Sequence, residues 1–276
     1  MSKADVIFIE TCNRILRDGV WDTAYDVRPK WADGTPAHTI KLFGVVNRYD
    51  LREEFPMQTI RKFNFRVPIE EILWIWQRKS NNINELDAKI WDQWADETGS
   101  IGKAYGYQLG IKHVYVEGMF DQVDRVLFDL KHNPQSRRIM TNIYNHQDLH
   151  EMHLYPCAYS MTFNVTGNVL NAILNQRSQD MLSANNFNVC QYAALLAMFA
   201  QVSGLVAGEL VHVIADAHIY DRHVPLIEKL MERKGYAAPT LCLDPKITDF
   251  YDFSTENVTL ENYQYHPGIG KIPVAE

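Results

Sequence analysis

The spacing of apolar residues in the first half of the chain predicts three helices. Apolar side chains recur at helical intervals over residues 3–17, and again over residues 120–132. A third segment, 70–76, carries an apolar stripe directly after Pro68, a residue type that is favoured in the first turn of a helix. We therefore expect amphipathic helices at these three places.

The second half of the chain changes to strand-like spacing. Polar and apolar residues partly alternate over 159–165 and 167–176, and the Thr-Gly pair between them favours a tight hairpin turn. Residues 187–204 are apolar almost all round, which predicts a buried central helix ended by a glycine. We also expect a core strand over 210–218 and an exposed helix over 223–234.

The remaining pattern bears on domain organisation. Residues 26–39 are rich in Pro, Gly, Asp and Thr and predict a loop, and a strand is expected at about 40–48. The chain shows no internal repeat, low-complexity tract or linker. We therefore predict an α+β fold, with a mixed β-sheet packed with helices, in a single catalytic domain that spans residues 1–276.

Composition and charge exclude several classes of protein. The chain is 46% hydrophobic and 22% charged, which is ordinary for a globular protein, and its net charge of −7 argues against a general nucleic-acid or membrane-surface binder. No segment approaches the ~18 apolar residues of a membrane span, and the first residues do not resemble a signal peptide. The four cysteines are widely separated, so neither a disulfide framework nor a metal site is expected. We predict a cytoplasmic protein with free thiols.

Four short segments hold more polar groups than the apolar pattern requires: 136–138, 154–159, 176–180 and 216–220. Each has an ordinary structural explanation, namely a basic helix end, a buried small thiol, a solvated loop and a satisfied core histidine. These explanations weaken when the segments are considered together, because their side chains complement the parts of a nucleotide.

Guanidinium groups suit a phosphate dianion, an acceptor and an amide can read the edge of a base, and a His–Tyr pair can hold a sugar hydroxyl. A thiolate near an arginine has a lowered pKa and is a usable nucleophile, so we expect a lowered pKa for Cys157. The sequence thus predicts a nucleotide-modifying enzyme that attacks covalently. The residues concerned are Arg28, Arg137, Arg138 and Arg177 for the phosphate, Asp180 and Asn188 for the base, and His218 and Tyr220 for the sugar.

Nearly the whole chain resembles the folate-dependent, non-flavin thymidylate synthase family. The most specific segments are LYPC at 154–157, QRSQD at 176–180 and FNVCQY at 187–192. The same order and spacing continue in DVRPKWADGTPAHT at 26–39, EEILWIW at 70–76, IWDQWAD at 90–96, AYGYQL at 104–109, DQVDRVLFDLKHNPQSRR at 121–138, DAHIY at 216–220 and PVA at 273–275.

The resemblance implies a reaction and a fold. It implies reductive methylation of dUMP to dTMP, a methyltransferase activity, with 5,10-methylenetetrahydrofolate as carbon and hydride donor and no metal. Cys157 would add to carbon 6 of the uracil, which turns carbon 5 into a nucleophile. The implied fold is that of the family, in which one face of the sheet forms a homodimer interface.

The resemblance also implies roles for individual residues. Glu71 would organise proton transfer through water alongside Tyr105, although a charge on the helix surface is the plain alternative. The implied catalytic residues are Cys157, Glu71, Tyr105, Arg177, Asp180 and Asn188. The implied dUMP ligands are Arg28, Gln176, Arg177, Ser178, Asp180, Asn188, His218 and Tyr220, with Arg137 and Arg138 lent by the other subunit. The implied folate contacts are Asn64, Trp91, Trp94, Leu154, Asp180 and Ala275.

Several positions depart from the family pattern. Ala184 stands where Gly is usual, so a turn that needs positive φ would be reshaped before Asn188. Ala215 also replaces a Gly, which adds a methyl group behind the sugar ligands, and Glu276 replaces the usual apolar last residue. The milder departures are Ala158 beside the predicted nucleophile, Asn64 for a common His, and Asn186 for Pro.

The Glu276 departure keeps a second activity open. In the family the tail closes over the folate, and a second carboxylate there could admit water to the reactive intermediate. The product would then be 5-hydroxymethyl-dUMP, released with tetrahydrofolate, while Asn188 favours uracil over cytosine as the base. A nucleotide- or RNA-binding module that binds its own messenger is a third reading, which the set Cys157, Arg177 and Asp180 disfavours.

Overall fold

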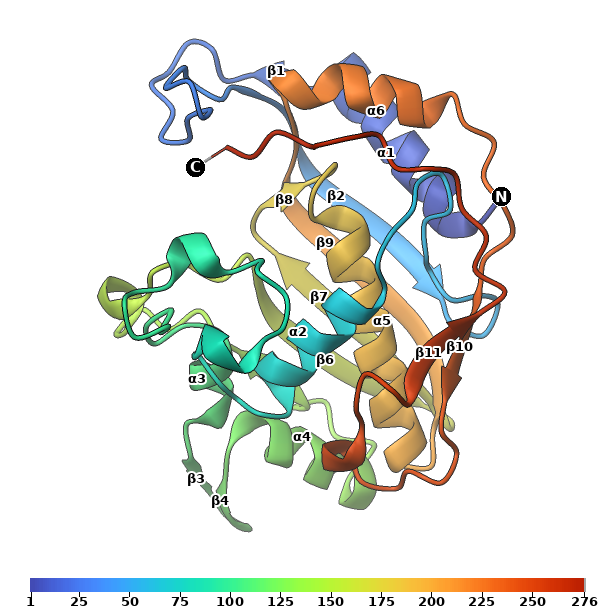
Figure 1. Ribbon diagram of the computed structural model, residues 1–276. Coiled ribbons are helices and arrows are strands. Elements are labelled where there is room, and N and C mark those ends of the chain that lie inside the picture. Colours follow the sequence, from blue (N-terminus) through green and yellow to red (C-terminus); the bar gives the residue numbers. More distant parts are fainter. Residues whose placement is uncertain (276) are drawn as a thin grey trace.

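A mixed β-sheet forms the centre of the molecule in the computed structural model, which describes residues 1–275 (Figure 1). Its strands are β1 (Val20–Trp21), β2 (Thr39–Asp50), β5 (Met140–Asn142), β6 (Ala158–Thr166), β7 (Val169–Gln176), β8 (Gln179–Asp180) and β9 (Val206–Tyr220). They lie in the order β1-β2-β9-β7-β6-β5, and β8 pairs with β9 beside this path. β9 is parallel to β7 and β8, and the other pairs are antiparallel.

Helices cover one face of the sheet, with α5 packed on β9 and β7 and α2 packed on α5 (Figure 1). The α-helices are α1 (Lys3–Asp18), α2 (Arg66–Trp76), α3 (Gly106–Gly110), α4 (Gln122–His132), α5 (Asn185–Val202) and α6 (Val224–Met231). Short 3₁₀ turns are η1 (Ile83–Glu85), η2 (Asp92–Trp94), η3 (Leu149–Glu151), η4 (Asp221–His223) and η5 (Phe250–Asp252). Two small hairpins complete the fold, β3 (His113–Tyr115) with β4 (Gly118–Phe120), and β10 (Thr240–Leu243) with β11 (Val258–Glu261). This arrangement confirms the predicted α+β class.

The elements predicted from periodicity are present, with shifted ends. α1 begins after Ser2, whose hydroxyl accepts a hydrogen bond from the backbone N–H of Asp5. α2 begins at Arg66, two residues before Pro68, and α5 begins two residues before the predicted start. The hairpin turn holds Gly167 at φ +65°, and Gly204 follows α5 at φ +68°, both in the left-handed region that favours glycine. The predicted exposed helix is shorter than expected and ends at Met231.

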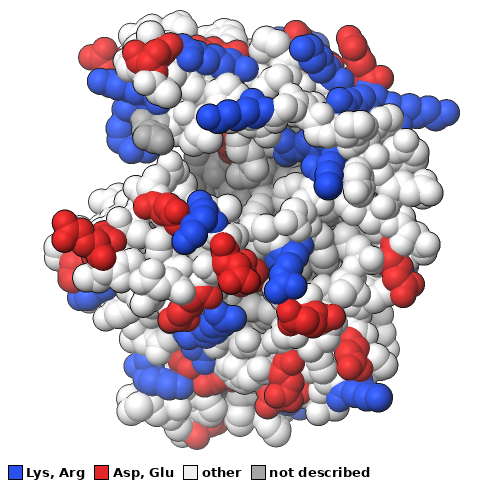
Figure 2. Space-filling model, viewed as in Figure 1, with Lys and Arg blue, Asp and Glu red and all other residues white. Residues whose placement is uncertain are grey.

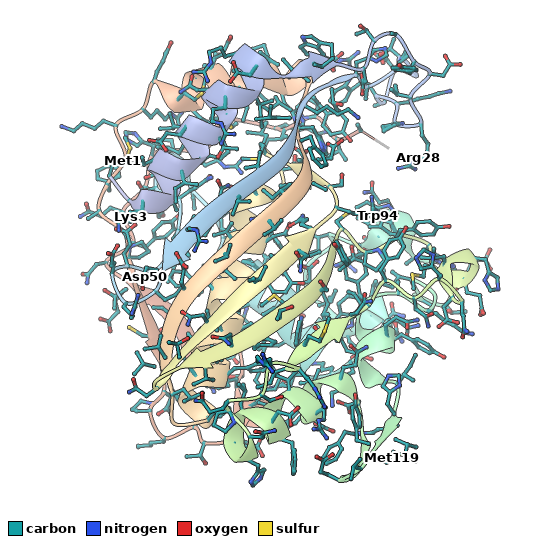
Figure 3. All side chains as sticks on the ribbon, turned by 180° about the vertical axis from the view of Figure 1, so that it is seen from behind. Met1, Lys3, Arg28, Asp50, Trp94 and Met119 are labelled. Carbon is teal, nitrogen blue, oxygen red and sulfur yellow. The ribbon has the colours of Figure 1, made fainter. Side chains whose placement is uncertain are left out.

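The face of the sheet opposite the helices is open to solvent (Figure 3). Phe43 is 88% exposed, Val46 is 50% exposed and Ile173 is 40% exposed on this side. Val46 pairs with Val213, and Ile173 pairs with Val211, so apolar side chains of adjacent strands lie together. A contiguous exposed apolar patch of this kind is typical of an interaction surface.

Two irregularities interrupt the strand pairing. Gly44, at φ +73°, and the exposed Ala215 are left out of the β2–β9 pairing, although the register is the same on both sides of them. The β6–β7 register does shift, between Ala158 and Ser160. A bulge of this kind increases local twist and redirects side chains, and it adjoins the predicted nucleophile. The methyl group of Ala215 therefore lies on the open side of the sheet. Within residues 1–275, no helix is both long enough and apolar enough to cross a membrane.

Candidate active site

The ends of four strands bring the polar segments together. Cys157 directly precedes β6, and Arg177 directly follows β7. These strands are antiparallel, with Ala158 opposite Gln176, so both residues lie at the same edge of the sheet. The Arg177 guanidinium lies 3.7 Å from Cys157 Sγ and also donates to the carbonyls of Pro156 (3.0 Å) and Tyr155 (2.8 Å). Two backbone carbonyls thus fix the guanidinium beside the thiol.

The expected lowering of the Cys157 pKa is wrong for this structure. Burial raises the pKa of the thiol, and the nearby positive charge of Arg177 only partly offsets that effect. The sequence predicted the neighbour correctly but not the burial, which depends on how the surrounding elements pack. The resting side chain is therefore a protonated thiol, and the Arg177 guanidinium lies close enough to stabilise the thiolate when it forms.

A tyrosine with a strained backbone contacts the segment that carries Cys157. Tyr105 has φ +47°, an unusual value for a residue with a side chain, and it directly precedes α3. Its hydroxyl accepts a hydrogen bond of 3.3 Å from the backbone N–H of Cys157. Burial raises the pKa of this phenol well above its usual value. Strain at such a position is typical of a functional site, because the surrounding structure has to maintain it.

A directional chain of hydrogen bonds joins α2, α5 and the sheet. The Gln191 amide donates to the carboxylate of Glu71. Asn188 Nδ2 donates to Gln191 Oε1 (3.2 Å), and Gln176 Nε2 donates to Asn188 Oδ1 (3.1 Å). The Nε2 of His212 lies 2.8 Å from Gln176 Oε1. The predicted residues Glu71, Asn188 and Gln176 are thus members of one network, in which Asn188 is half-buried and the other two are buried.

Burial controls the charge of Glu71. The residue is 7% exposed, and burial raises the pKa of its carboxyl to about 7, while hydrogen bonds from Gln191 and Trp91 act in the opposite direction. The Trp91 indole donates to the second carboxylate oxygen (2.5 Å), and its ring packs edge-on against Trp94 and Tyr105. A carboxyl that titrates near neutral pH suits proton transfer. The alternative of a charge on the helix surface is therefore wrong.

The two predicted sugar ligands lie on β9 beside Asp180. The backbone of Asp180 pairs with that of His218, and His218 Nδ1 lies 2.8 Å from a carboxylate oxygen of Asp216. The Tyr220 ring packs edge-on against His218. Burial and the negative charge of Asp180 raise the pKa of Tyr220 to about 12, so its hydroxyl stays a neutral donor. His218 and Tyr220 thus lie on the same side of their strand.

A buried histidine connects Asp180 to the C-terminal segment. His223 Nδ1 lies 3.5 Å from Asp180 Oδ1, and its Nε2 lies 2.8 Å from the carbonyl oxygen of Pro273. Burial alone would lower the pKa of His223, but the Asp180 carboxylate outweighs it and the net shift is upward. Burial raises the pKa of Asp180, and here too the partner outweighs it, so the net shift is downward. The segment that includes Ala275 is thereby tied to the site, while Glu276 lies outside the described residues.

The remaining predicted phosphate ligands stay apart in this chain. Arg28 lies on the exposed loop between β1 and β2, and Arg137 and Arg138 follow α4 at the surface. Arg138 lines a groove of about 790 Å³ together with Arg125 and Met140. Within residues 1–275, no hydrogen bond connects Arg137 or Arg138 to Cys157. Figure 3 places Arg28 and Trp94 on the same flank of the molecule. Figure 2, which shows the opposite face, has a hollow with Lys and Arg side chains around its rim.

The other predicted positions are exposed or half-buried. Asn64 is exposed beside the start of α2, Leu154 packs at the edge of the main core, and Ser178 is half-buried with its carbonyl oxygen facing Gln176. Ala184 has φ −110°, so no positive φ is required there and the expected strain does not arise. Asn186 is buried and accepts a hydrogen bond of 2.9 Å from the backbone N–H of Gln58.

Sequence reasoning missed three residues that the structure joins to the site: Gln191, His212 and His223. Gln191 lies within the segment that carried the resemblance, three residues after Asn188, so helical spacing alone could have indicated it. His212 lies in a strand that read as core, and no local signal separates it from an ordinary buried histidine. Among residues 1–275 no cluster of His, Cys, Asp and Glu could hold a metal ion.

Comparison with known proteins agrees with this geometry. Residues 6–275 match the family model described as thymidylate synthase. The chain is 42% identical over 270 residues to thymidylate synthase 1 of Bacillus subtilis (strain 168) and 43% identical over 270 residues to the thymidylate synthase of Bacillus licheniformis, with 96% of each chain covered. Its structure is similar to that of the thermostable thymidylate synthase A from Bacillus subtilis, with a TM-score of 0.95, 40% identity and full coverage of both chains. The chain therefore belongs to the thymidylate synthase family.

Proposed function

We propose that this enzyme catalyses the reductive methylation of dUMP to dTMP with methylenetetrahydrofolate as cosubstrate, and that Cys157 forms the covalent bond to the pyrimidine. The family membership favours this methyltransferase reaction over the 5-hydroxymethylase alternative. The observation that carries the role of Cys157 is its thiol at the strand edge, 3.7 Å from a guanidinium that backbone carbonyls hold in place.

The thiol adds to carbon 6 of the uracil ring, and the displaced electron pair makes carbon 5 nucleophilic. The raised pKa of Cys157 keeps the sulfur protonated at rest, and Arg177 stabilises the thiolate as it forms. Carbon 5 then bonds to the methylene carbon of the cosubstrate. Loss of the carbon 5 proton breaks the bond between that carbon and the folate nitrogen, so tetrahydrofolate leaves and an exocyclic methylene forms on the ring. Hydride from the same folate reduces the exocyclic methylene, and elimination of the cysteine leaves dTMP and dihydrofolate.

Glu71 serves as the proton-handling group near the base. Its pKa of about 7 lets it exchange a proton at neutral pH, and the hydrogen bonds from Gln191 and Trp91 hold both carboxylate oxygens in place. Tyr105 anchors the backbone of Cys157. We assign Asn188 to the edge of the uracil ring, because it is the amide that lies between the two buried glutamines.

We assign the sugar and phosphate of dUMP to the strand edge and its surroundings. His218 and Tyr220 bind the sugar hydroxyl, and Arg28, Arg177 and Ser178 bind the phosphate. The folate would lie against the tail, where Asp180 and His223 hold the Pro273 carbonyl. The predicted folate contacts are Asn64, Trp91, Trp94, Leu154, Asp180 and Ala275.

A homodimer completes the phosphate site in this proposal. The open apolar face of the sheet offers a self-complementary surface to a second copy of the chain, because Val46 and Ile173 lie among apolar neighbours on it. Arg137 and Arg138 are exposed and lie outside the hydrogen-bonded site of their own chain. We therefore assign both arginines to the phosphate bound by the partner. A single catalytic domain over 1–276 and a cytoplasmic location remain predictions.

The products of the reaction test the proposal. Enzyme, dUMP and methylenetetrahydrofolate are mixed, and the nucleotide and folate products are separated, identified and quantified by mass spectrometry. We expect dTMP with dihydrofolate in equal amounts. Hydroxymethyl-dUMP with tetrahydrofolate would contradict the proposed reduction step. Binding of dUMP with neither product, and with no covalent complex on addition of 5-fluoro-dUMP and folate, would indicate a binding module instead.

A further inference from the structure

One buried histidine has no part in the proposed chemistry, yet it ends the hydrogen-bond chain that reaches the base-reading amide. His212 lies in β9, is 0% exposed and faces the helices. Its Nε2 is 2.8 Å from Gln176 Oε1, whereas its Nδ1 is buried without a hydrogen-bond partner among residues 1–275. A buried polar atom without a partner lowers the stability of the fold. An apolar residue would avoid this cost, so we expect a role that requires the histidine.

An acceptor that cannot reverse restrains one end of the Gln176 amide, and His212 contacts the other end. Gln176 Nε2 donates to the backbone carbonyl of Ser178 (3.0 Å) as well as to Asn188 Oδ1. A carbonyl oxygen only accepts, so the nitrogen end of the Gln176 amide faces Ser178 and its oxygen faces His212. His212 therefore donates from Nε2, and Nδ1 carries the lone pair. The opposite tautomer would set two acceptors against each other and bury an N–H without an acceptor.

The other end of the chain is fixed in the same way. Gln191 Nε2 donates to the carboxylate of Glu71 and to the backbone carbonyl of Pro68 (3.2 Å). Its oxygen must then accept from Asn188. The Asn188 amide thus receives a hydrogen bond on its oxygen from Gln176 and gives one from its nitrogen to Gln191. Both neighbours demand the same orientation of this amide.

The orientation of that amide decides which base it can bind. After these two bonds, the Asn188 oxygen can accept one more hydrogen bond and the nitrogen can donate one more. Uracil presents an N–H donor at position 3 and an oxygen acceptor at position 4, whereas cytosine presents the reverse pattern. A ring held at carbon 6 by Cys157 and at its phosphate by arginines cannot turn over, so a reversed amide would suit cytosine.

We infer that His212 is a positioning residue for base specificity: its Nε2–H holds Gln176, and through it Asn188, in the orientation that accepts uracil and rejects cytosine. This inference rests on the proposed function, because it assumes that Asn188 reads a pyrimidine. His212 itself does not touch the substrate in this account.

Three variants separate donation by His212 from a merely structural role. His212→Phe keeps a ring but removes the donor. His212→Gln can place an amide nitrogen near the former Nε2, and His212→Asn is also polar but too short to reach Gln176. Equilibrium binding of dUMP and of dCMP is measured for each variant and for the wild-type enzyme, together with kcat and KM for dUMP and thermal unfolding.

We expect the ratio of dUMP to dCMP affinity to fall about tenfold in His212→Phe and His212→Asn, since one orienting hydrogen bond is lost, and to recover in His212→Gln. A structural role alone would lower stability and affinity for both nucleotides but leave the ratio unchanged. An unchanged ratio in folded His212→Phe overturns the inference. Failure of the wild-type enzyme to bind dUMP would instead overturn the proposed function.

The tautomer can be read without any substitution. Side-chain ¹⁵N NMR of the wild-type enzyme, with the His212 signals assigned through His212→Phe or by selective labelling, distinguishes protonated from unprotonated ring nitrogens. We expect a proton on Nε2 and none on Nδ1 at pH 7. A neutral ring with its proton on Nδ1 would contradict the inference, even if the variants failed to fold.

Discussion

The two ends of the proposed nucleotide site are built in opposite ways. At the base end, Glu71, Gln191, Asn188, Gln176 and His212 form a continuous chain of directional hydrogen bonds inside the protein. At the phosphate end, Arg28, Arg137 and Arg138 are exposed, and the last two follow α4 along the chain. Within residues 1–275, Arg177 is the one arginine of this set whose side chain donates hydrogen bonds.

The difference reflects what each end has to recognise. A base edge carries a pattern of donors and acceptors, so its reader must be held in one orientation before binding, at a cost met by the protein core. A phosphate dianion is recognised by charge, and long arginine side chains can close around it from separate elements or subunits. The base end is therefore organised within one chain, whereas in our proposal arginines of a partner chain complete the phosphate end.

The largest expected effect on turnover comes from Cys157, which we place between the base end and the phosphate end. Cys157→Ser keeps the shape of the site but removes the sulfur nucleophile, and we expect turnover to fall by about 10³-fold or more while dUMP binding is largely kept. Turnover is measured by dihydrofolate formation, and binding by calorimetry. The variant should also form no covalent complex with 5-fluoro-dUMP and folate. Substantial residual turnover would reject Cys157 as the nucleophile.

Hybrid dimers test whether the phosphate end is shared between subunits. Arg137→Glu reverses a charge on the proposed partner arginine, and each single variant, including Cys157→Ser, should be nearly inactive alone. If the two chains exchange at random, half of the dimers carry one intact site, so activity should recover to about a quarter of the wild-type value.

The exchange itself has to be verified, for example by capture of an affinity-tagged chain with its untagged partner. Recovery is expected only after the subunits have mixed. Absence of recovery in a sample that contains hybrid dimers would mean that Arg137 acts within its own chain or not at all. A matched mixture of Cys157→Ser with Glu71→Gln serves as the control. Each of these residues acts in the site of its own chain, so a hybrid dimer has one lesion in each site and no intact site. No activity should be recovered in this mixture.

The smallest expected effect concerns the charge of the base end. The pKa of Glu71 is about 7 in the folded enzyme, above the usual value of 4.5. The folded protein therefore binds more protons than the unfolded chain between these two values, and stability falls as pH rises from about 4.5 to about 7. Glu71→Gln should remove about 3 kcal/mol of this decline, estimated as order of magnitude from the size of the shift.

Urea unfolding of both proteins from pH 4.5 to pH 8 checks the sign as well as the size. The stability of Glu71→Gln relative to the wild-type enzyme should increase over this window and level off above about pH 7. A difference that is independent of pH would show that Glu71 titrates at its ordinary value. Arg138→Ala, on the exposed phosphate end, is the matched control and should leave the pH dependence of stability unchanged.

Much of this site could be predicted from short segments. Periodicity indicated α1, α4, α5 and the β6–β7 hairpin, because each of these elements buries one face or its whole surface and writes that burial into the spacing of its residues. The order of motifs predicted Cys157 beside Arg177 before any contact was visible. Helix ends were less accurate: α2 begins at Arg66, two residues before Pro68, although no side chain caps its start, and periodicity does not define such boundaries.

Other properties depended on how distant segments pack. The pKa of Cys157 is raised and not lowered, because desolvation by the assembled fold exceeds the attraction of one arginine. The shift of Glu71 has the same origin, since α5 and Trp91 enclose its carboxyl. His212 and His223 could not be recognised as part of the site, because their significance lies only in the partners that the sheet and the tail bring to them.

The amino-acid sequence by itself determined the family and the class of fold and predicted which groups react, since residue types and their local spacing encode these features. Only the tertiary structure decided which polar atoms are enclosed, which way each amide points and which carboxyl titrates near neutrality. The physical reason is that desolvation and hydrogen-bond direction are properties of a whole environment, and no single segment carries them.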